Sequence, residues 1–496
     1  MPALLDEIKL APQQIYFLIP TPNQLPITMI TTSFFELFKI GPGPSSSHTI
    51  GPMRAAYQFR QDAANYLCTA LHLPNSTLQI RCELFGALAA TGHGHGTHRA
   101  VLAGLMGCTP TSVDTEQLTN FFETINEQYT LDFEQTKILF TENDIFFDYG
   151  FNPYRHPNTL KLVLLVDYTP VLTQVFYSVG GGFIEQEGGN KEAIGKSNLA
   201  QPPKYVYKNM QELEATQRNT GLPIDQLLIE NEMALTGMNE EQIFDRLDDI
   251  LRVMDESVQR GLQREGILPG GLNVHRRAKT MYQKAQQLEA QGRHADSLFA
   301  RLNAYALATS EENAAGNMVV TAPTNGAAGV IPACLTYLRT DCQIPENLLQ
   351  RGLVVAAMIG FIIKNNASIS GAELGCQAEV GSAAAMAAAL FAFCHHEPLS
   401  VMAMAAEIAM EHHLGMTCDP IKGLVQVPCI ERNANGAIKA YNAYLLAVGR
   451  NTQPIISFDQ VVEVMRQTGI DLSEKYKETA TGGLASSFGW GNMPGS

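Results

Sequence analysis

Three cysteines stand where the backbone is expected to turn. Cys376 lies in ISGAELGCQAEVG, Cys418 in GMTCDP and Cys429 in VPCIERNANG, each with glycine, proline or aspartate close by. Thiolates at such turns can ligate a metal ion or an iron–sulfur cluster. The spacings of 42 and 11 positions match no standard cluster motif. Because buried cysteines are also common in cores, spacing alone leaves both interpretations open.

A second candidate is the glycine-rich turn ATGHGHGTHRA, which carries His93, His95 and His98 at the expected start of a helix. Such a turn lets a ligand approach the backbone, and a helix N-terminus favours an anion such as a carboxylate. A neutral imidazole there can take a proton near pH 7. We expect one functional histidine, with His93 and His98 exposed on either side of it. A zinc site or a solvated turn is the alternative.

The stretch GPGPSSSHTIGPM, from Gly41 to Met53, places three serines and a histidine between two Gly-Pro elements. Glycine and proline punctuate the chain, and serine hydroxyls compete for backbone hydrogen bonds. We predict a loop, or a loop that leads into a helix. The hydroxyls and the imidazole suit binding of a carboxylate or an ammonium group. The residues concerned are Ser45, Ser46, Ser47 and His48.

Two further loops combine hydroxyls, amides and glycines: TAPTNGAAGVIP (321–332) and NNASISGAELG (365–375). These groups suit the recognition of a small polar molecule, whereas a simple helix cap is the alternative. The candidates are Thr324, Asn325, Ser370 and Gly371. His156, in YRHPNTL, precedes a predicted strand, where we expect it to orient a loop and to be one of the substrate-binding residues.

The pattern of elements changes once along the chain. Strand-like runs such as LQIRCELFG, LKLVLLVDY and VLTQVFYSV alternate with helical stretches before residue 185, and helical spacing without strand signal follows residue 204. This predicts an α+β chain. The expected divisions are an extension (1–28), a mixed α/β domain (29–185), a linker (186–204), a mostly helical domain (205–485) and a tail (486–496).

Composition limits the function classes. The chain has 496 residues, is 45% apolar and 17% charged, and carries a net charge of −15 without a basic cluster, which argues against nucleic-acid binding. Nine cysteines without a secretory signal favour a reducing cytoplasm. The apolar runs GLVVAAMIGFII and VGSAAAMAAALFAFC are expected to be buried helices, so we predict no membrane partner.

Taken together, these segments resemble the iron–sulfur L-serine dehydratases (L-serine ammonia-lyases) of bacteria, in the single-chain form with β-type and α-type parts fused. The resemblance runs in order from Met29 to Ala485. The matching motifs are FFELFKIGPGPSSSHTIGPMRAA, GALAATGHGHGTHRA, YSVGGGF, LPGGLNVHRRA, TAPTNGAAGVIPA, ASISGAELGCQAEVG, MEHHLGMTCDPIKGLVQVPCIERNA and KYKETATGGLA.

The resemblance implies a site and a reaction. A 4Fe–4S cluster would be held by Cys376, Cys418 and Cys429, with its fourth iron open to substrate. His95 would be the catalytic base, with His48 as the second catalytic residue, and the loop from Ser45 to His48 would help bind the amino acid at the domain interface. The reaction would convert L-serine to pyruvate and ammonia without pyridoxal phosphate, in a homodimer.

The chain departs from that family pattern in two places. It has no cysteine after Cys429, so no tail thiol can occupy the open iron. His93 and His98 stand where lysine and aspartate are expected in close relatives. Three alternatives stay open: L-cysteine desulfidation, L-threonine deamination, and a non-catalytic sensor of serine or of an iron–sulfur cluster.

Overall fold

The computed structural model describes residues 29–69, 76–124, 127–133, 136–188 and 200–488. The predicted extension, 1–28, lies outside the described residues, as do most of the predicted linker (189–199) and of the predicted tail (489–496). The described chain has a mixed α/β part followed by a mostly helical part, which confirms the predicted α+β class.

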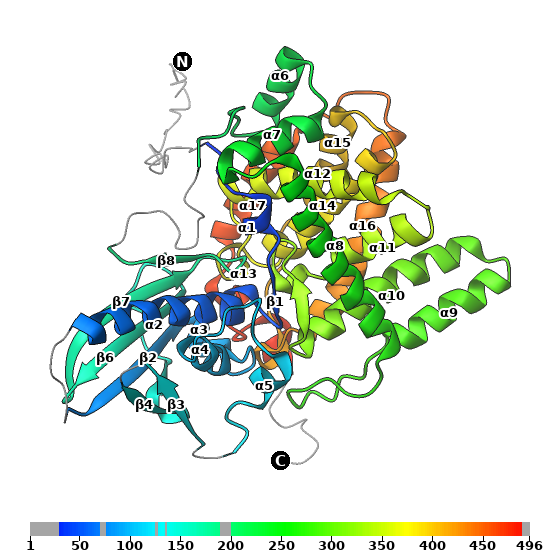
Figure 1. Cartoon of the computed structure of the whole chain (residues 1–496). Helices are drawn as coiled ribbons and strands as arrows, with labels where there is room; N and C mark the ends of the chain where they lie inside the picture. Colours follow the sequence, from blue (N-terminus) through cyan, green and yellow to red (C-terminus); the bar gives the residue numbers. More distant parts are fainter. Residues whose placement is uncertain (1–28, 70–75, 125–126, 134–135, 189–199, 489–496) are drawn as a thin grey trace, which may run out of the picture.

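A five-stranded sheet organises the first part (Figure 1). Its order is β5-β2-β6-β7-β8; β2 and β5 run parallel, and the other neighbours run antiparallel. The three longest strands cover the predicted β-branched and aromatic runs. The strands are β2 (Leu78–Gly86), β5 (Ile145–Asp148), β6 (Asn158–Val166), β7 (Thr169–Ser178) and β8 (Ile184–Gln186).

Helices α2 (Gly51–Thr69) and α4 (Thr97–Leu105) cover one face of this sheet. Phe59 and Val101 of these helices join Leu84 and Phe176 of the strands in one buried core. That core holds the ends of β2 and α4 in place, and the histidine turn lies between them. The remaining elements here are α3 (Ala87–Thr91), α5 (Thr115–Asn120), β3 (Gln128–Asp132), β4 (Lys137–Thr141) and η2 (Glu142–Asp144).

The second part is a helical body with its own core. Its helices are α6 (Met210–Thr220), α7 (Ile224–Thr236), α8 (Glu240–Gln263), α9 (Ala278–Ala290), α10 (His294–Ala314), α11 (Val330–Thr340), α12 (Glu346–Asn366), α13 (Gly371–Leu374), α14 (Ser382–Cys394), α15 (Leu399–Glu411), α16 (Cys429–Val448), α17 (Phe458–Asp471) and α18 (Gly483–Ser487). Short turns of helix are η3 (Asn325–Ala327), η4 (Gln377–Gly381), η5 (Ile421–Gly423) and η6 (Glu474–Tyr476).

Helices α12 and α14 lie at the centre of this body: residues 352–363 of α12 are all buried, and so is every residue of α14 except Phe393. Among the described residues, two helices, Glu346–Asn366 and Gln377–Cys394, are long and apolar enough to cross a membrane by length and composition. However, 72% and 94% of their apolar windows are buried inside the molecule, as in core helices. They therefore match the predicted buried helices.

The start of the described chain belongs structurally to the helical body. Phe34 and Leu37 of α1 (Phe34–Leu37) are buried in the core of the helical part, and β1 (Ile40–Pro42) pairs antiparallel with β9 (Met318–Val320). Three-residue strands carry too little periodicity to be found in sequence, so this pairing was missed.

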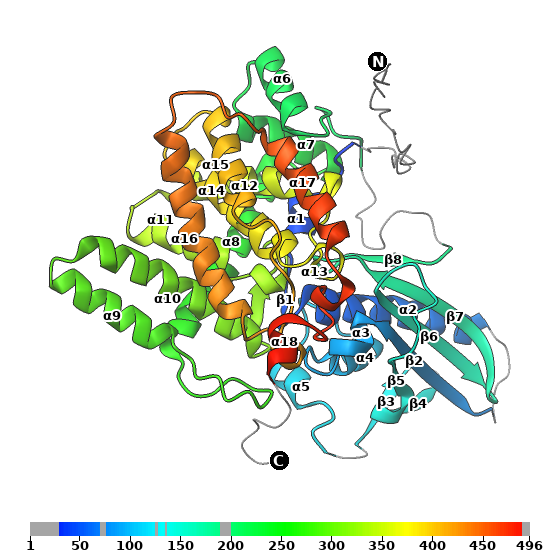
Figure 2. The same cartoon turned by 180° about the vertical axis from the view of Figure 1, so that it is seen from behind.

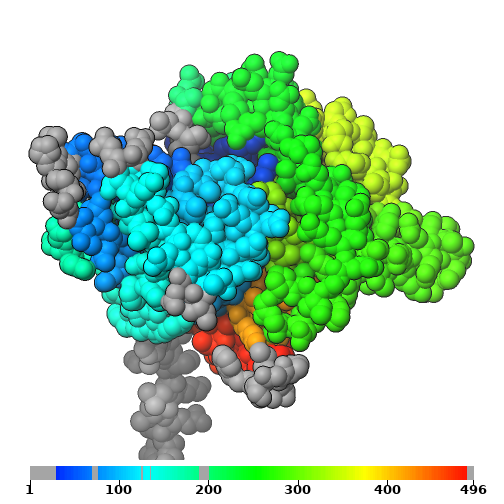
Figure 3. Space-filling view, turned by 60° about the horizontal axis from the view of Figure 1, so that its bottom comes forward, coloured from blue at the N-terminus to red at the C-terminus, as the bar shows by residue number. Residues whose placement is uncertain are grey.

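The two parts pack directly on each other, as the space-filling view shows (Figure 3). From behind, α13 and the C-terminal α18 lie beside α3 and α4 of the first part (Figure 2). The last described segment therefore returns to the junction, where the predicted site residues also lie.

Candidate active site

The serine-rich loop ends in a tight turn that leads straight into a helix, which confirms the second of the two predicted alternatives. Ser45 is the N-cap of the π-helical turn η1 (Ser46–Ile50), and its hydroxyl accepts from the backbone N–H of His48 at 3.1 Å. Helix α2 follows at Gly51. The three serines and His48 are all buried, so this polar segment lies inside the junction rather than on the surface.

His48 is held as a neutral imidazole. Its Nε2 lies 3.1 Å from the carbonyl oxygen of Ala87, which can only accept, so Nε2 carries the hydrogen. Its Nδ1 therefore accepts from the Ser47 hydroxyl at 2.9 Å. Burial lowers the pKa of His48 to about 4, against the hydrogen bond to Ala87, which raises it.

His95 has the opposite tautomer. Its Nδ1 donates to the carbonyl oxygen of Thr91 at 3.0 Å, which leaves a lone pair on Nε2. That Nε2 is buried and has no hydrogen-bond partner among the described residues. Burial, and then the nearby His48, lower the pKa of His95 well below its usual value. His95 is thus a neutral base with its free nitrogen inside the protein.

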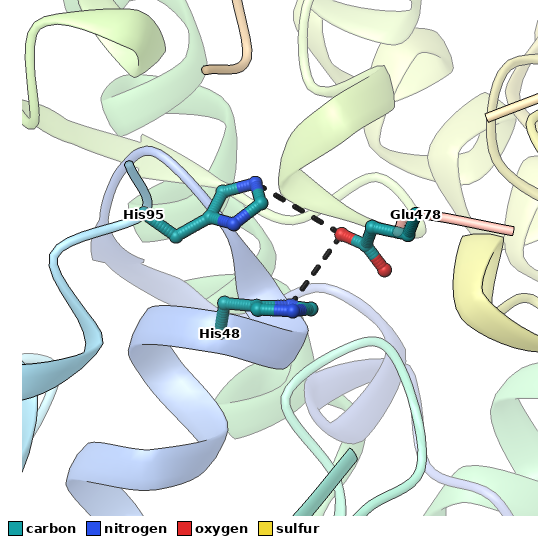
Figure 4. A group of neighbouring side chains, drawn as sticks. All are labelled: His48, His95 and Glu478. Carbon is teal, nitrogen blue, oxygen red and sulfur yellow. Dashed lines mark ion pairs between the residues drawn. The ribbon is translucent and has the colours of Figure 1, made fainter. Parts of the chain in front are cut away.

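Glu478 lies to one side of the two imidazoles, with one carboxyl oxygen facing a nitrogen of each ring (Figure 4). Its Oε1 is 3.4 Å from Nδ1 of His48 and 4.0 Å from Nε2 of His95, and the two rings are 4.4 Å apart. Burial, and then the charge of Cys376, raise the pKa of Glu478 to about 8, although the Ser47 hydroxyl lowers it. Near neutral pH the carboxyl of Glu478 is therefore mainly protonated, and both imidazoles beside it are neutral.

Two threonines lock the histidine segments together. The Thr97 hydroxyl donates to the backbone carbonyl of His48 at 2.6 Å, and the Thr49 hydroxyl donates to the backbone carbonyl of His95 at 2.8 Å. At the same turn, Gly96 has φ 65, a left-handed conformation that glycine adopts without steric cost. The geometry of the two rings is thus fixed by reciprocal bonds.

The three predicted cluster cysteines are buried in one region. Ligand atoms of Cys376, Cys418 and Glu379 lie within 4.8 Å of one another. The Arg432 guanidinium lies close enough to all three cysteines for their charges to act on it. Burial lowers the pKa of Arg432, but the charges of Cys376, Cys429 and Cys418 help to raise that pKa overall. The turns that the sequence separates by 42 and 11 positions therefore meet around one guanidinium.

The cysteine region and the histidine cluster are joined through the C-terminal segment. The N–H of Cys418 donates to the carbonyl of Tyr476, and the N–H of Glu478 donates to the carbonyl of Cys418, both at 2.8 Å. A parallel bridge between Cys418 and Lys477 results. The backbone that positions Glu478 beside the imidazoles is therefore also bonded to Cys418.

The donor set fits an iron–sulfur cluster with an open position. The hydrogen bond with Cys376, and then burial, raise the pKa of Cys418 well above its usual value, and burial does the same to Cys429. Thiols this deeply buried lose their protons readily only when a cation replaces them. Three cysteines fill three positions, and the described residues bring no fourth cysteine to the region.

The two small-residue loops border this region. A Cβ on Gly371 would lie 3.3 Å from Sγ of Cys418, and the Thr324 hydroxyl lies beside the carboxyl of Glu379. The hydroxyl oxygen of Ser370 and the amide oxygen of Asn325 are buried without a hydrogen-bond partner among the described residues. These unpartnered groups leave hydrogen-bonding capacity for a polar ligand.

His156 lies apart from the other two histidines. Its Nδ1 accepts from the N–H of Asn158 at 3.0 Å, and its Nε2 donates to Glu373 of α13 at 3.2 Å. It therefore links the sheet to the helical body, and no described contact joins it to His48 or His95. Its role in orienting a loop or in binding substrate stays a prediction.

Two carboxylates were missed in the sequence. Glu379 follows Cys376 by three positions, with its Oε2 3.8 Å from that thiol, and burial raises its pKa to about 8. Glu478 stands in KYKETATGGLA, a motif in the resemblance to which no role was attached. A glutamate flanked by polar residues has no signal of burial, so only the fold identifies it.

The prediction that His93 and His98 are both exposed is half wrong. His93 is exposed, but His98 has only 6% of its surface accessible, because α4 turns it under Phe122 and Phe147. His412 and His413 directly follow α15, and their Nδ1 atoms donate to carbonyl oxygens of that helix.

Known proteins with similar sequences cover nearly the whole chain. The family model described as the serine dehydratase beta chain matches residues 33–189, and that of the alpha chain matches residues 219–485. Proteins named L-serine dehydratase from Streptomyces coelicolor and Haemophilus influenzae are 45% and 42% identical to it, each over 91% of this chain and 98% of the relative. L-serine dehydratase 2 of Escherichia coli is 41% identical over the same shares. With both family models matched in order within one chain, the protein belongs to the serine dehydratase family.

Proposed function

We propose that this protein is an iron–sulfur L-serine dehydratase, a lyase that converts L-serine to pyruvate and ammonia. The observation that carries the proposal is the buried, unpartnered Nε2 of His95, which faces Glu478 at 4.0 Å. Glu478 is bonded through its backbone to Cys418 of the three-cysteine region. The relatives' names supply the substrate class.

The reaction removes two groups from adjacent carbons. L-serine loses its α-proton and its β-hydroxyl, which leave together as water, and aminoacrylate remains. Aminoacrylate tautomerises to an imine, which takes up water and releases ammonia to give pyruvate. The catalyst must therefore accept a weakly acidic proton and assist a poor leaving group.

His95 is the proposed base for the α-proton. The bond from Nδ1 to Thr91 fixes the ring with the Nε2 lone pair toward the junction. When Nε2 takes the proton, the resulting imidazolium lies beside the carboxyl of Glu478, and the ionised form of that carboxyl would stabilise the new charge. Glu478 can then pass the proton toward Nδ1 of His48 at 3.4 Å.

Cys376, Cys418 and Cys429 would hold the cluster. When bound, a 4Fe–4S group with an open iron supplies Lewis acidity for the departure of the β-hydroxyl. The residues around the cluster site have separate roles in handling protons and charge. Glu379 beside Cys376, with its raised pKa, can hold a proton in this buried region, and Arg432 balances the negative charge of the thiolates.

The serine loop and the two small-residue loops are the proposed substrate contacts. Ser45, Ser46, Ser47 and His48 enter from the first part, whereas Thr324, Asn325, Ser370 and Gly371 enter from the helical body. The free oxygens of Ser370 and Asn325 can accept from an ammonium group, and hydroxyls can donate to a carboxylate. His156 would keep α13 in place through Glu373.

The test is an anaerobic assay after reconstitution with iron and sulfide. We expect pyruvate from L-serine, brown protein, and loss of activity in air. Cys418→Ala should lose both cluster absorbance and turnover, whereas Cys334→Ala, at another buried cysteine in α11, should keep both. No pyruvate from reconstituted protein would refute the proposal.

The same assay decides the substrate. L-threonine would yield 2-oxobutyrate, and L-cysteine would yield pyruvate and sulfide. L-threonine differs from L-serine by one methyl group, which a pocket discriminates by only about 1–3 kcal/mol, and L-cysteine differs in its leaving group, so both are to be compared with L-serine. A homodimer in the cytoplasm is proposed from the resemblance alone, and light scattering measures that assembly.

A further inference from the structure

Three potential ligands converge on the histidine turn outside the candidate active site. They are His93 in the turn, His98 in the first part of α4, and Glu142 at the start of η2 between β4 and β5. Their ligand atoms lie within 4.8 Å of one another, and the two imidazole rings are 5.1 Å apart. None of the three contacts the buried cysteines among the described residues.

The buried imidazole of His98 has a ring nitrogen without a hydrogen-bond partner among the described residues. It is 94% buried, from the 6% of its surface that is accessible, and its Nδ1 has no hydrogen-bond partner among the described residues. A buried polar atom without a hydrogen-bond partner destabilises the folded protein. A ring so placed beside a second imidazole and a carboxylate has the donor set that a zinc-class cation prefers.

The surroundings keep both rings oriented and neutral. Phe147 stacks on His93 at 3.9 Å with an interplanar angle of 15°, and Phe122 lies 5.9 Å from His98. Burial lowers the pKa of His98 to about 3, helped by the charges of His93 and Arg99, so its nitrogens are free of the second proton. Neutral imidazole is the form that binds metal.

We propose that His93, His98 and Glu142 bind one zinc-class divalent cation, with water in the fourth position. Tetrahedral zinc, bound at about 2.0–2.2 Å, holds its ligand atoms roughly 3.4 Å apart. The present separations are within 4.8 Å, and His93 and Glu142 are exposed, so changes of side-chain rotamer alone can close the site.

The cation would clamp the turn that carries His95. On one side, the metal ties the turn to η2 and to the edge strand β5, which holds Phe147. On the other side, a Cβ on Gly94 would lie only 2.8 Å from the carbonyl oxygen of Lys422, so the turn already abuts the helical body. The site does not depend on the proposed reaction, and its test does not use turnover.

The probe is Zn²⁺ itself, added at micromolar concentration to the reconstituted protein, followed by removal of free metal. We expect one more zinc per chain in the unaltered protein than in His93→Gln or Glu142→Gln, two exposed positions that tolerate substitution. Zinc should also raise the melting temperature of the unaltered protein only. His294→Gln is the control, since His294 lies 2.7 Å from Glu289 but has no second imidazole.

The absorption spectrum of bound Co²⁺ distinguishes metal at this site from metal bound by the cysteines. Cobalt at His93, His98 and Glu142 shows ligand-field bands without thiolate charge transfer, and these bands should vanish in Glu142→Gln. Equal zinc content in all variants, or a cobalt spectrum with thiolate bands alone, would overturn the proposal.

Discussion

Glu478, whose carboxyl group faces both histidines of the site, is the site residue that the sequence indicates least. Glu478 has positive φ, 60°, and its Oε2 is buried without a partner among the described residues. A residue held in a sparsely populated conformation beside two imidazoles indicates a constrained functional position. Its raised pKa makes it a proton carrier rather than a fixed charge.

Glu478→Gln should slow turnover without removing the cluster. The amide keeps the shape of the side chain but cannot accept a proton from His95, so we expect kcat to fall about 10- to 100-fold, with cluster absorbance and KM nearly unchanged. Steady-state kinetics under anaerobic conditions measure this. A matched change at Glu474→Gln, on the exposed turn just before it, should have no effect. Unaltered kcat in Glu478→Gln would exclude the proton-carrier role.

Replacing the proposed base should have a larger effect. His95→Ala removes the free Nε2 lone pair, and loss of a general base costs about 10²–10⁴ in rate. The cluster absorbance should stay, since no cysteine ligand contacts His95. His412→Gln, at the exposed end of α15, is the control. An active His95→Ala protein would remove His95 from the mechanism.

Sequence and structure agree best on the residues whose motif is local. His48 and His95 each sit between glycines or prolines that mark a turn, and the structure brings their rings to 4.4 Å. Only the family resemblance predicted Cys376, Cys418 and Cys429 as cluster ligands, because their spacing matches no standard motif. Only the structure identifies Glu478, since the position of this residue depends on a β-bridge between Cys418 and the distant Lys477.

At the scale of elements, one buried carboxyl links α1 to α7. Glu232 accepts from the Ser33 hydroxyl and from the N–H of Phe34 at 3.1 Å, and it thereby satisfies the start of α1 from outside that helix. Burial raises the pKa of Glu232 to about 7, although both hydrogen bonds lower it. The carboxyl is therefore protonated in the folded protein at pH values where it is ionised in the unfolded chain.

This shift predicts a pH dependence of stability. Between about pH 4.5 and 7 the folded state holds a proton that the unfolded chain has released, so the free energy of unfolding falls as pH rises. At about 1.4 kcal/mol per pKa unit, the loss attributable to Glu232 is at most about 3 kcal/mol. Glu232→Gln should remove this contribution, so the free energy of unfolding should fall less between pH 5 and pH 7.5 than in the unaltered protein, as measured by denaturant unfolding.

The exposed Glu241→Gln, in the first turn of α8, serves as the control and should retain the slope of the unaltered protein. If Glu232→Gln showed that same slope, the raised pKa of Glu232 would not contribute to stability.

Long elements were predictable and short ones were not. β2, β6 and β7 have nine or ten residues, and α8 buries Ile243, Leu247 and Ile250 at helical spacing, so the periodic signal is strong. β1 and β9 have three residues each, and the π-helical turn at Ser46–Ile50 has no repeating pattern. Their conformations depend on contacts made across the junction.

Each of the two parts of the molecule receives a segment that packs against the other part. α1 and β1 precede the sheet domain in sequence yet lie in the helical body: Phe34 stacks on Phe361 at 5.7 Å, and β1 pairs with β9. The C-terminal segment makes the reverse connection and carries Glu478 to the histidines of the first part. The site is therefore complete only when both parts are docked.

This arrangement predicts that the chain can be divided without losing its assembly. The family models describe the two matched parts as separate chains, and fragments 1–188 and 200–496, made together, should form one complex. Three buried side chains of the first fragment, Phe34, Leu37 and Phe38, enter the helical core. Each contributes about 1.5–3 kcal/mol when buried.

A first fragment that begins at Gly43 keeps the sheet, His48 and His95 but lacks α1 and β1. Its affinity for the helical fragment should fall about 100-fold or more, because the lost burial exceeds the 2.7 kcal/mol that a 100-fold change requires by the conversion of roughly 1.4 kcal/mol per tenfold. Titration calorimetry or gel filtration on dilution measures the difference, and Phe34→Ala in the longer fragment should give an intermediate loss. If fragment 43–188 bound as tightly as 1–188, the docked faces alone would hold the molecule together, and the N-terminal segment would have no part in assembling the site.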